Sequence, residues 1–262
     1  MMLSLAKKTT YPLKHRIATR FAQAAHTYDA AARVQRNVAQ DLTDLVIKAP
    51  LANQPHVLEV GCGTGVLTSL LLPALQPALW HLTDLSPALV RSSAHRMRAL
   101  QQKVMARAMD GEAPDLPPNS VDLVVSNMVV QWFQDLEGSI DRLSTCLKPG
   151  GLLALTLPGA KTFTEWRTLC AEAGLAPILP PGPACASLVR RFPHALITRA
   201  VHRLPPQTVG NFLSYLRQIG AHTHPHTLQT TPFKNMRHLI ARYSGRSLDT
   251  HYEILTFLWR KV

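Results

Sequence analysis

The chain has 262 residues, enough for one large domain with a packed core or for two small ones. Its composition, 46% hydrophobic and 17% charged, is typical of a globular protein, and no apolar run approaches the roughly 18 residues that cross a bilayer. The net charge of +12 favours binding to an acidic partner, and three kinds are possible: nucleic acid, an anionic membrane or an acidic protein. The basic residues are scattered, so charge alone does not choose among these partners, and solubility remains the simpler explanation.

The cysteines and the first residues of the chain indicate the cellular compartment in which the protein works. The four cysteines form no CxxC pair, which argues against a disulfide framework or a zinc knuckle and predicts buried thiols in a reducing compartment: Cys62, Cys146, Cys170 and Cys185. The opening stretch "MMLSLAKKTTYPLKHRIATRF" is basic, and no acidic residue precedes Asp29. That composition suits a mitochondrial presequence as well as an ordinary start followed by a basic helix. We expect a cytoplasmic protein, with mitochondria as the alternative.

An amphipathic stripe predicts one N-terminal helix. Its residues follow alternating steps of four and three: Ile17, Phe21, Ala24, Tyr28, Ala31, Gln35, Val38, Leu42 and Leu45. Tyr28 and Gln35 interrupt the stripe with polar tips. The stripe is either a packing surface whose tips reach solvent or a lid over a ligand.

The segment "HVLEVGCGTG", residues 56–65, predicts a strand, a glycine turn and the start of a helix. A dinucleotide fingerprint requires G-x-G-x-x-G, but here the third glycine comes one residue early, at Gly65. With Glu59 before the turn, the pattern E-x-G-x-G-x-G resembles motif I of the class I S-adenosylmethionine-dependent methyltransferases. That cofactor has no pyrophosphate for a helix N-terminus to bind, and glycines allow the backbone to approach its methionine zwitterion closely.

The next segments continue an alternation of strands and helices. A second strand ends at Asp84 and precedes a helix with Ser86 as its cap and Pro87 in its first turn. A third strand, around residues 104–110, ends at Asp110, and a fourth, "DLVVS", ends at Ser126 and Asn127. "LSTCLKPGGLLALTL" adds a helix, a turn and a fifth strand.

These strand ends predict a ligand site, because open α/β sheets bind ligands at the carboxyl ends of their strands. Glu59, Asp84, Asp110 and Ser126 all fall at such ends. Asp84 is placed to accept hydrogen bonds from both ribose hydroxyls and Asp110 to meet the adenine amino group. The alternative for Asp84 is a helix cap.

The methyl acceptor has to be inferred from the rest of the chain. Enzymes that methylate nucleobase amino groups commonly carry N/D-P-P-Y/F after the fourth strand, whereas this chain reads "SNMVVQW". We therefore expect no nucleic-acid partner. The stretches "RFAQAAHTYDAAARVQRNVAQDL", "LPPNSVDLVVSNMVVQWFQDL", "LRQIGA" and "LDTHYEILTFLWRK" resemble the malonyl-acyl-carrier-protein O-methyltransferases of biotin synthesis. The resemblance runs from about Arg16 to the C-terminus.

The sequence departs from that family after "LRQIGA", where it reads "AHTHPHT" in place of the usual asparagine, and between Tyr243 and Leu248. The alternating His222, His224 and His226 permit a metal site, but no carboxylate or cysteine is near, which favours a polar loop and no metal. Other functions stay open: a methyltransferase-like assembly factor or protein hydroxylase, or a methyltransferase for another small carboxylic acid or for RNA.

The resemblance implies an α/β fold, a Rossmann-like class I methyltransferase sheet that is mostly parallel with an antiparallel last strand. It implies an N-terminal helical cap at residues 1–50, a core at 51–205, a helical lid insertion at 206–248 and the last strand at 249–262. The cofactor would be S-adenosylmethionine and the partner an acidic acyl-carrier protein carrying malonyl, with no membrane. The sequence does not determine the oligomeric state, and we expect a monomer. The implied cofactor-binding residues are Arg16, Gln35, Glu59, Gly61, Cys62, Gly63, Asp84, Leu85, Asp110, Gly111, Ser126 and Asn127.

The implied reaction needs few catalytic groups. A malonyl carboxylate with a pKa of about 4 is already ionised, so no general base is required. An arginine is needed to select it, because a guanidinium binds a carboxylate in a bidentate manner. We assign this role to Arg217, with Arg199 and Arg203 as alternatives, and place Tyr28 near the sulfonium.

Overall fold

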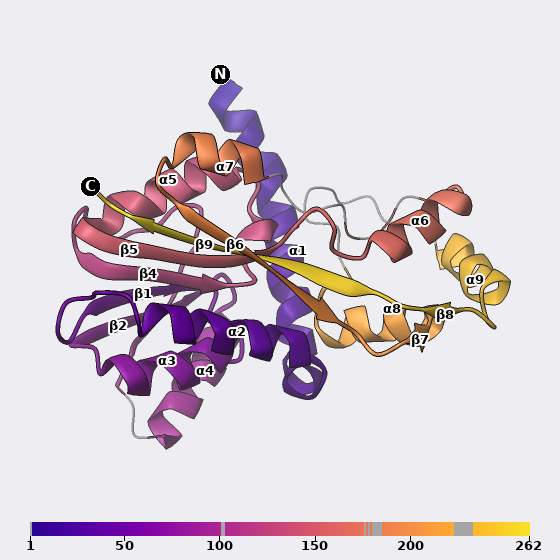
Figure 1. The fold of residues 1–262 in the computed structure, drawn as a ribbon, viewed down its shortest axis with the longest axis horizontal. Coiled ribbons are helices and arrows are strands. Elements are labelled where there is room, and N and C mark those ends of the chain that lie inside the picture. The colour runs from indigo at the N-terminus through magenta and orange to yellow at the C-terminus, as the bar shows by residue number, and fades with distance from the viewer. Residues whose placement is uncertain (1, 101–102, 176, 178, 180–184, 223–232) are drawn as a thin grey trace.

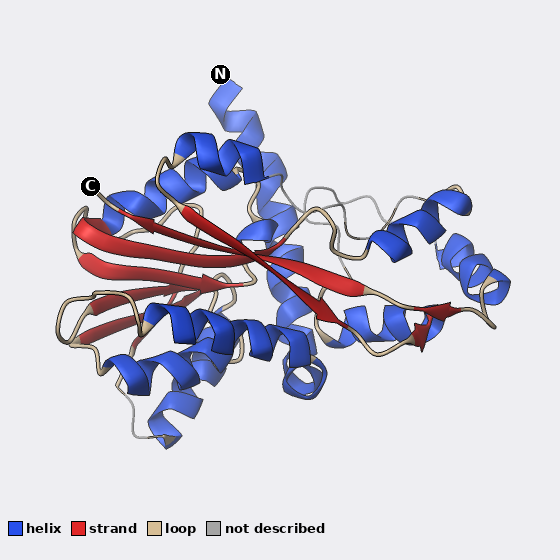
Figure 2. Cartoon of the chain, in the orientation of Figure 1, coloured by secondary structure: helices blue, strands red, loops and turns tan. Residues whose placement is uncertain are grey.

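The computed structural model describes residues 2–100, 103–175, 177, 179, 185–222 and 233–262. Its centre is a seven-stranded sheet in the order β3-β2-β1-β4-β5-β9-β6 (Figures 1 and 2). From one edge to the other these strands are β3 (Met105–Ala108), β2 (Leu79–Asp84), β1 (His56–Val60), β4 (Val121–Asn127), β5 (Leu147–Pro158), β9 (His251–Arg260) and β6 (Leu196–Arg203). Strand β9 is antiparallel to both of its neighbours, and the other pairs are parallel. The predicted fold class is confirmed.

Helices cover both faces of the sheet (Figure 1). On one face lie α2 (Arg33–Val46), α3 (Val66–Leu75) and α4 (Pro87–Ala99), and on the other α5 (Leu136–Cys146) and α7 (Cys185–Arg191). A hydrophobic core lies between the sheet and the helices on each of its two faces. Alternate residues of each strand contribute to one core or the other, because successive side chains along a strand point to opposite faces. In β1, Val57 packs under α2 and α3, whereas Leu58 packs with the α5 side. The buried free thiols Cys62 and Cys146 lie in these cores and Cys170 in a third, as predicted.

The prediction of a single N-terminal helix is wrong. The structure has α1 (Met2–Ala31) and α2, and the backbone leaves the helical region at Ala32, with φ −82° and ψ 46°. The stripe stays buried or half-buried on both sides of the break, but the two parts cover different surfaces. Helix α2 packs on β4 and β5, whereas α1 turns across the carboxyl ends of the strands (Figure 1). One straight helix does not reach both surfaces, and the periodicity of a stripe does not show a change of direction.

A second group of elements lies beyond the carboxyl end of the sheet (Figure 1). It contains α6 (Thr164–Glu172), β7 (Gln207–Thr208), α8 (Val209–Gln218), α9 (Phe233–Arg242) and β8 (Ser247–Leu248). A cluster that includes Trp166, Phe212 and Tyr252 joins these elements to β9. Helices α8 and α9 fall within the helical insertion expected at residues 206–248, whereas α6, the β7–β8 pair and the edge strand β6 were not predicted. Strand β6 is almost entirely exposed and so lacks an apolar pattern. The four-part division of the chain stays a prediction.

Within the described residues, no helix combines the length and apolar character needed to span a membrane.

Candidate functional site

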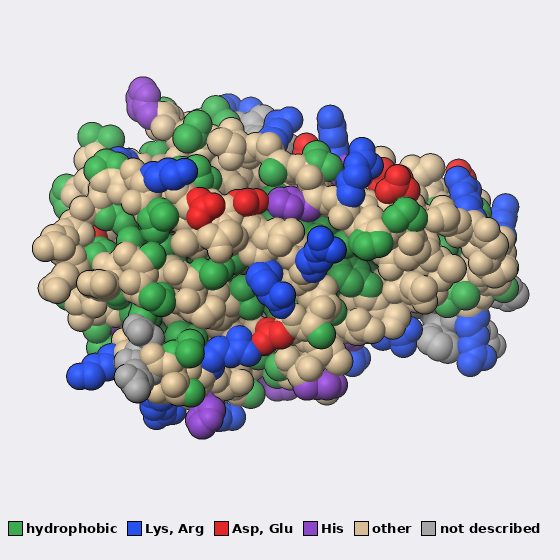
Figure 3. Space-filling view, turned by 60° about the horizontal axis from the view of Figure 1, so that its bottom comes forward, with side chains coloured by type: hydrophobic (Ala, Val, Ile, Leu, Met, Phe, Trp, Pro, Cys, Tyr) green, Lys and Arg blue, Asp and Glu red, His purple; other side chains and the backbone are tan. Residues whose placement is uncertain are grey.

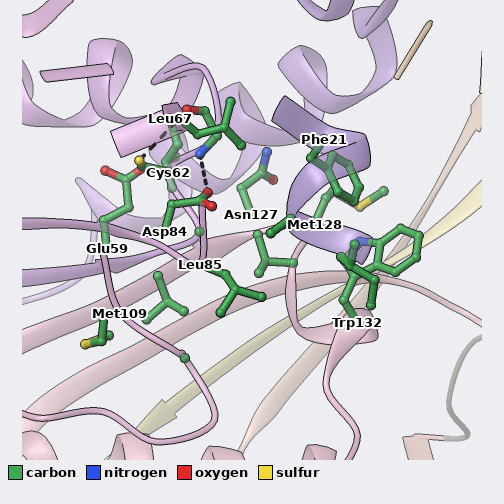
Figure 4. A pocket seen from close by; sticks show the side chains of 18 of the residues that line it. Phe21, Glu59, Cys62, Leu67, Asp84, Leu85, Met109, Asn127, Met128 and Trp132 are labelled. Carbon is green, nitrogen blue, oxygen red and sulfur yellow. Dashed lines mark hydrogen bonds between the residues drawn. The ribbon is translucent and has the colours of Figure 1, made fainter. Parts of the chain in front are cut away.

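A pocket lies at the carboxyl ends of β1, β2 and β4, under α1 (Figure 4). It encloses about 1100 Å³ of space, part of it open to solvent. Most of the predicted site residues line it: Tyr28, Gln35, Glu59, Gly61, Cys62, Gly63, Asp84, Leu85, Asp110, Gly111 and Asn127.

Three predicted site residues are not among those that line the pocket. Ser126 is fully buried, and its hydroxyl donates to the carbonyl of Val60 at 2.8 Å, which joins β4 to β1. Arg16 is half-buried on α1, between neighbours that do face the pocket. Arg217 is exposed in the last turn of α8. Ser126 is the residue before the last of β4, and successive side chains of a strand point to opposite faces, so a place near the strand end did not determine that it would face the pocket.

The turn after β1 needs its glycines. Gly61 has φ +72°, and a Cβ built there would lie 2.5 Å from Cγ2 of Val129, so any side chain is excluded. Gly63 has φ +54°, and nothing lies within 4 Å of a Cβ built at that position. The backbone at Gly63 therefore faces the open space of the pocket, where a ligand can approach it closely.

Asp84 ends β2 and faces the turn (Figure 4). Its Oδ2 accepts from the Gly63 amide at 3.0 Å and its Oδ1 from the Ser86 amide at 2.8 Å. Ser86 itself caps α4, accepting from the Leu89 amide at 3.4 Å, so the helix-cap alternative for Asp84 is wrong. Desolvation raises the pKa of Asp84. A carboxylate has about four acceptor sites, so Asp84 retains acceptor capacity beyond its backbone amide donors, as recognition of a ribose diol requires.

Glu59 is buried beside Asp84 (Figure 4). Its Oε2 accepts from the hydroxyl of Thr68 at 2.7 Å and from the indole of Trp80 at 3.0 Å. Burial raises the pKa of Glu59 to about 7, although both hydrogen bonds oppose the shift. The group thus changes charge near neutral pH, next to the turn that would hold the cofactor.

Asp110 has a partner that the sequence did not indicate. Lys14, on α1, donates to Asp110 at 2.7 Å and lies 2.5 Å from a carboxylate oxygen of Glu112. Burial acts to lower the pKa of Lys14, but the two carboxylates raise it overall. Lys14 and Glu112 both line the pocket. Nothing in the sequence pattern singles them out, since Lys14 is one of many basic residues near the N-terminus.

The side of the pocket away from the strand ends is apolar. Phe21 of α1 meets Trp132 edge to face, with ring centroids 5.2 Å apart, and Met128 lies beside them (Figure 4). Burial raises the pKa of Tyr28 well above its usual value, so its hydroxyl is neutral at physiological pH. Tyr28 is therefore a hydrogen-bond donor and no base.

Gln35 presents a buried acceptor to the pocket. Its Nε2 donates to the hydroxyl of Tyr252 at 3.3 Å, and that hydroxyl lies 3.0 Å from the hydroxyl of Tyr215. Its Oε1 is buried with no hydrogen-bond partner among the described residues. A buried amide oxygen without a donor is costly, so this position favours a ligand with an N–H or ammonium group.

The three alternating histidines fall at the edge of the described residues. His222 is half-buried, while His224 and His226 lie outside the described residues. The side chains that the structure describes include no group of His, Cys, Asp or Glu arranged to hold a metal ion.

A sheet with this strand order, a glycine turn after β1 and a carboxylate at the end of β2 define a class I S-adenosylmethionine-dependent methyltransferase. The family model described as "Methyltransferase domain" matches residues 58–153. The fold agrees with the solved structure of the YcgJ protein of Bacillus subtilis, with a TM-score of 0.62 and 14% identity over 85% of this chain and 98% of that one.

Curated relatives narrow the class. The malonyl-[acyl-carrier protein] O-methyltransferase of Magnetococcus marinus is 37% identical over 211 residues, which cover 79% of this chain and 77% of that protein. The biotin biosynthesis bifunctional protein BioCD of Bordetella avium is 31% identical over 245 residues, 94% of this chain. This chain spans about half (52%) of that bifunctional relative. The chain belongs to the malonyl-[acyl-carrier protein] O-methyltransferase family, and its cofactor is S-adenosylmethionine.

The pocket fits this cofactor. The open backbone at Gly63, the remaining acceptor capacity of Asp84 and the buried Oε1 of Gln35, which has no partner among the described residues, match a ligand that carries a ribose diol and an ammonium group. These residues would hold the two polar ends of S-adenosylmethionine.

Proposed function

We propose that this chain transfers the methyl group of S-adenosylmethionine to the free carboxylate of a malonyl thioester on acyl-carrier protein, giving a methyl ester for biotin synthesis. The observation that carries the proposal is the 37% identity over most of both chains to a protein named for that reaction. The pocket supports it, because an apolar wall of Phe21, Met128 and Trp132 faces the polar cofactor residues.

The chemistry of the site agrees with a carboxylate acceptor. S-adenosylmethionine supplies an electrophilic methyl group on a sulfonium. A malonyl carboxylate, with a pKa of about 4, attacks without losing a proton. Tyr28 is neutral and half-buried, so it can donate a hydrogen bond to an acceptor oxygen but removes no proton. The site therefore acts by positioning the oxygen and excluding water, which weakens the hydration of the attacking anion.

A cationic group next to the pocket supports an acidic substrate. Burial, together with the nearby charges of Arg20 and Arg217, lowers the pKa of His222, so each of the two guanidinium groups lies near that histidine. Arg20 lies on α1 and Arg217 on α8, and these two helices meet at a contact in which Thr27 donates to the carbonyl of Gln218 at 2.9 Å. Next to this contact, Gly220 packs on Phe21, which lines the pocket.

We assign Arg217 to the malonyl carboxylate and the wider basic surface to the acidic carrier protein. Lys and Arg side chains are spread over the face drawn in Figure 3, interspersed with few acidic ones. The net charge of +12 makes long-range attraction of an acidic carrier favourable.

Mass spectrometry of malonyl-acyl-carrier protein after incubation with the enzyme and S-adenosylmethionine tests the reaction. A gain of one methyl group is expected. Tight carrier binding without that gain would overturn the proposal and favour a non-catalytic role.

The Arg217→Met variant tests the anchor. Its KM for malonyl-acyl-carrier protein should rise at least tenfold, because an ionic hydrogen bond is lost, while its affinity for S-adenosylmethionine stays unchanged. Arg199→Met and Arg203→Met are the matched comparisons. Arg203 pairs only loosely with Asp249, at 3.8 Å, on the exposed strand β6. A rise in this KM that occurs in only one of these two variants, and not in Arg217→Met, would identify that arginine as the group that binds the malonyl carboxylate.

A further inference from the structure

Helix α1 closes the cofactor pocket and is attached by ionic contacts at two points along its length. Between these points its inner face lines the pocket through Ile17, Ala18, Phe21 and Tyr28. The two contacts are made by Lys14 and Asp29, almost at the two ends of the covering segment.

Asp29 connects three elements. One carboxylate oxygen accepts from the hydroxyl of Thr64 at 2.7 Å, and the other forms an ion pair with the guanidinium of Arg96 on α4. Thr64 belongs to the glycine turn, and the preceding residue, Gly63, is the one whose amide donates to Asp84. Partial burial acts to raise the pKa of Asp29, but the hydrogen bonds from Arg96 and Thr64 lower it overall. The carboxylate is thus ionised at neutral pH and holds α1 directly against the cofactor turn.

Lys14 makes the corresponding contact at the other side. It donates to Asp110 and lies against Glu112. Glu112 is itself fixed, because its Oε1 accepts from the amides of Gln134 at 2.8 Å and Asp135 at 2.9 Å. Lys14 therefore joins α1 to the loop after β3 and, through Glu112, to the start of α5.

The chain has a point at which α1 is able to pivot. Ala32 separates α1 from α2 with non-helical backbone angles, while α2 stays packed on the sheet. When the contacts of Asp29 and Lys14 break, α1 keeps its packing on α8 and Trp132, and Ala32 is the point at which it can turn without disturbing the strands. Tyr28 directly precedes Asp29, so the place of the tyrosine ring over the pocket follows from the contact that Asp29 makes.

We propose that Asp29 is a positioning residue, which seats Tyr28 and the rest of α1 on the glycine turn through Thr64 and Arg96, and that with Lys14 it sets the rate at which the cofactor leaves. Asp29 touches no reacting atom and acts through the helix that it holds. The proposal depends on the cofactor pocket and is independent of the identity of the methyl acceptor.

The test compares Asp29→Ala and Asp29→Asn with the wild type. The asparagine keeps an acceptor for Thr64 and loses only the charge. Stopped-flow measurement of the dissociation of S-adenosylhomocysteine should give a rate about tenfold faster for Asp29→Ala and about threefold faster for Asp29→Asn, as expected when a half-exposed ion pair and one further hydrogen bond are lost. Turnover should fall in Asp29→Ala while the KM of the carrier substrate changes little.

Two further measurements separate positioning from general destabilisation. Raising the salt concentration should accelerate dissociation in the wild type but not in a Lys14→Met, Asp29→Ala double variant, because screening acts only on charges that are present. In the cofactor-free protein, hydrogen exchange of residues 17–31 should be faster in Asp29→Ala than in the wild type. Both readouts are independent of methyl transfer.

Arg191→Met is the matched control. It breaks an ion pair with Asp141 that joins α7 to α5 and involves no residue of the pocket lining. It should leave dissociation and the exchange of α1 unchanged. The proposal is overturned if Asp29→Ala dissociates the cofactor at the wild-type rate, or if Arg191→Met accelerates dissociation equally. Cofactor binding without methylation of malonyl-acyl-carrier protein would instead refute the proposed substrate and leave this inference intact.

Discussion

Replacing Asp84 with alanine is the most direct test of the cofactor site. The carboxylate already accepts from the amides of Gly63 and Ser86 and keeps lone pairs for a ribose diol. Removing it deletes charge-assisted hydrogen bonds to the ligand, which are worth about 1.5–3 kcal/mol. The dissociation constant of S-adenosylmethionine should therefore rise about 10- to 150-fold. Asp84→Asn should lie between the wild type and Asp84→Ala, because one amide oxygen still accepts.

Isothermal titration calorimetry with S-adenosylmethionine and S-adenosylhomocysteine gives these constants, and circular dichroism reports the fold. The matched control is Asp122→Ala. Asp122 also accepts from a backbone amide, that of His56 at 2.9 Å, and pairs with Lys148 at 2.8 Å, but it lies at the opposite ends of β1 and β4. Asp122→Ala should keep the wild-type affinity. If folded Asp84→Ala also binds within twofold of the wild type, the role of Asp84 in the cofactor site is refuted.

Two shorter predictions concern groups whose protonation the fold controls. The ordinary pKa of Glu59 is 4.5 and its pKa in the folded protein is about 7, so between these pH values the folded chain holds a proton that the unfolded chain has lost. The free energy of unfolding should therefore fall as the pH rises from 4.5 to about 7, by at most about 1.4 kcal/mol per pH unit. Above about pH 7 it should level off. Denaturant titrations of the cofactor-free protein should show a shallower slope for Glu59→Gln, and an identical slope would contradict the assignment. Tyr28→Phe should keep the fold and the affinity for S-adenosylmethionine while turnover falls several-fold, since only a hydroxyl donor is lost. Steady-state kinetics check this, and wild-type turnover would show that the ring merely packs.

The sequence was informative wherever a residue's role follows from its place in a strand or turn. The spacing of Gly61, Gly63 and Gly65 and the end of β2 at Asp84 predict the turn and its carboxylate, because the parallel sheet brings those positions together in any chain with this alternation. Ser126 satisfied the same rule and still turned inward, since a strand end does not determine which way the side chain points.

Contacts between distant segments could not be predicted in this way. Lys14 reaches Asp110 across 96 positions and Asp29 reaches Arg96 across 67, and a single sequence carries no signal for either pair. The break at Ala32 could not be predicted for a related reason. The helical stripe continues through the break, although the two helices pack against different parts of the protein. The edge strand β6 was missed because it buries almost nothing.

The charges in the pocket imply an order of binding. Four carboxyl groups line it, those of Glu59, Asp84, Asp110 and Glu112, and Lys14 is the one lysine or arginine among the described lining residues. Lys14 balances only the Asp110–Glu112 end. A malonyl anion that entered first would meet uncompensated negative charge at Asp84 and, above neutral pH, at Glu59. No positive charge of the described lining residues lies there to offset the free-energy cost of removing water from the anion. The cationic cofactor removes that obstacle.

We therefore expect the cofactor to bind before the malonyl substrate. Malonyl-acyl-carrier protein should bind about tenfold more tightly to enzyme that holds sinefungin, whose amine places a positive charge near the position of the sulfonium, than to cofactor-free enzyme. S-adenosylhomocysteine, which lacks that charge, should give a smaller gain. A carrier protein with a neutral acyl group should show no difference between the two ligands, because only a carboxylate responds to the added charge. Equal affinity of the malonyl form for all three states of the enzyme would show that an arginine outside the pocket lining supplies the whole attraction, and that the pocket charges do not control the order.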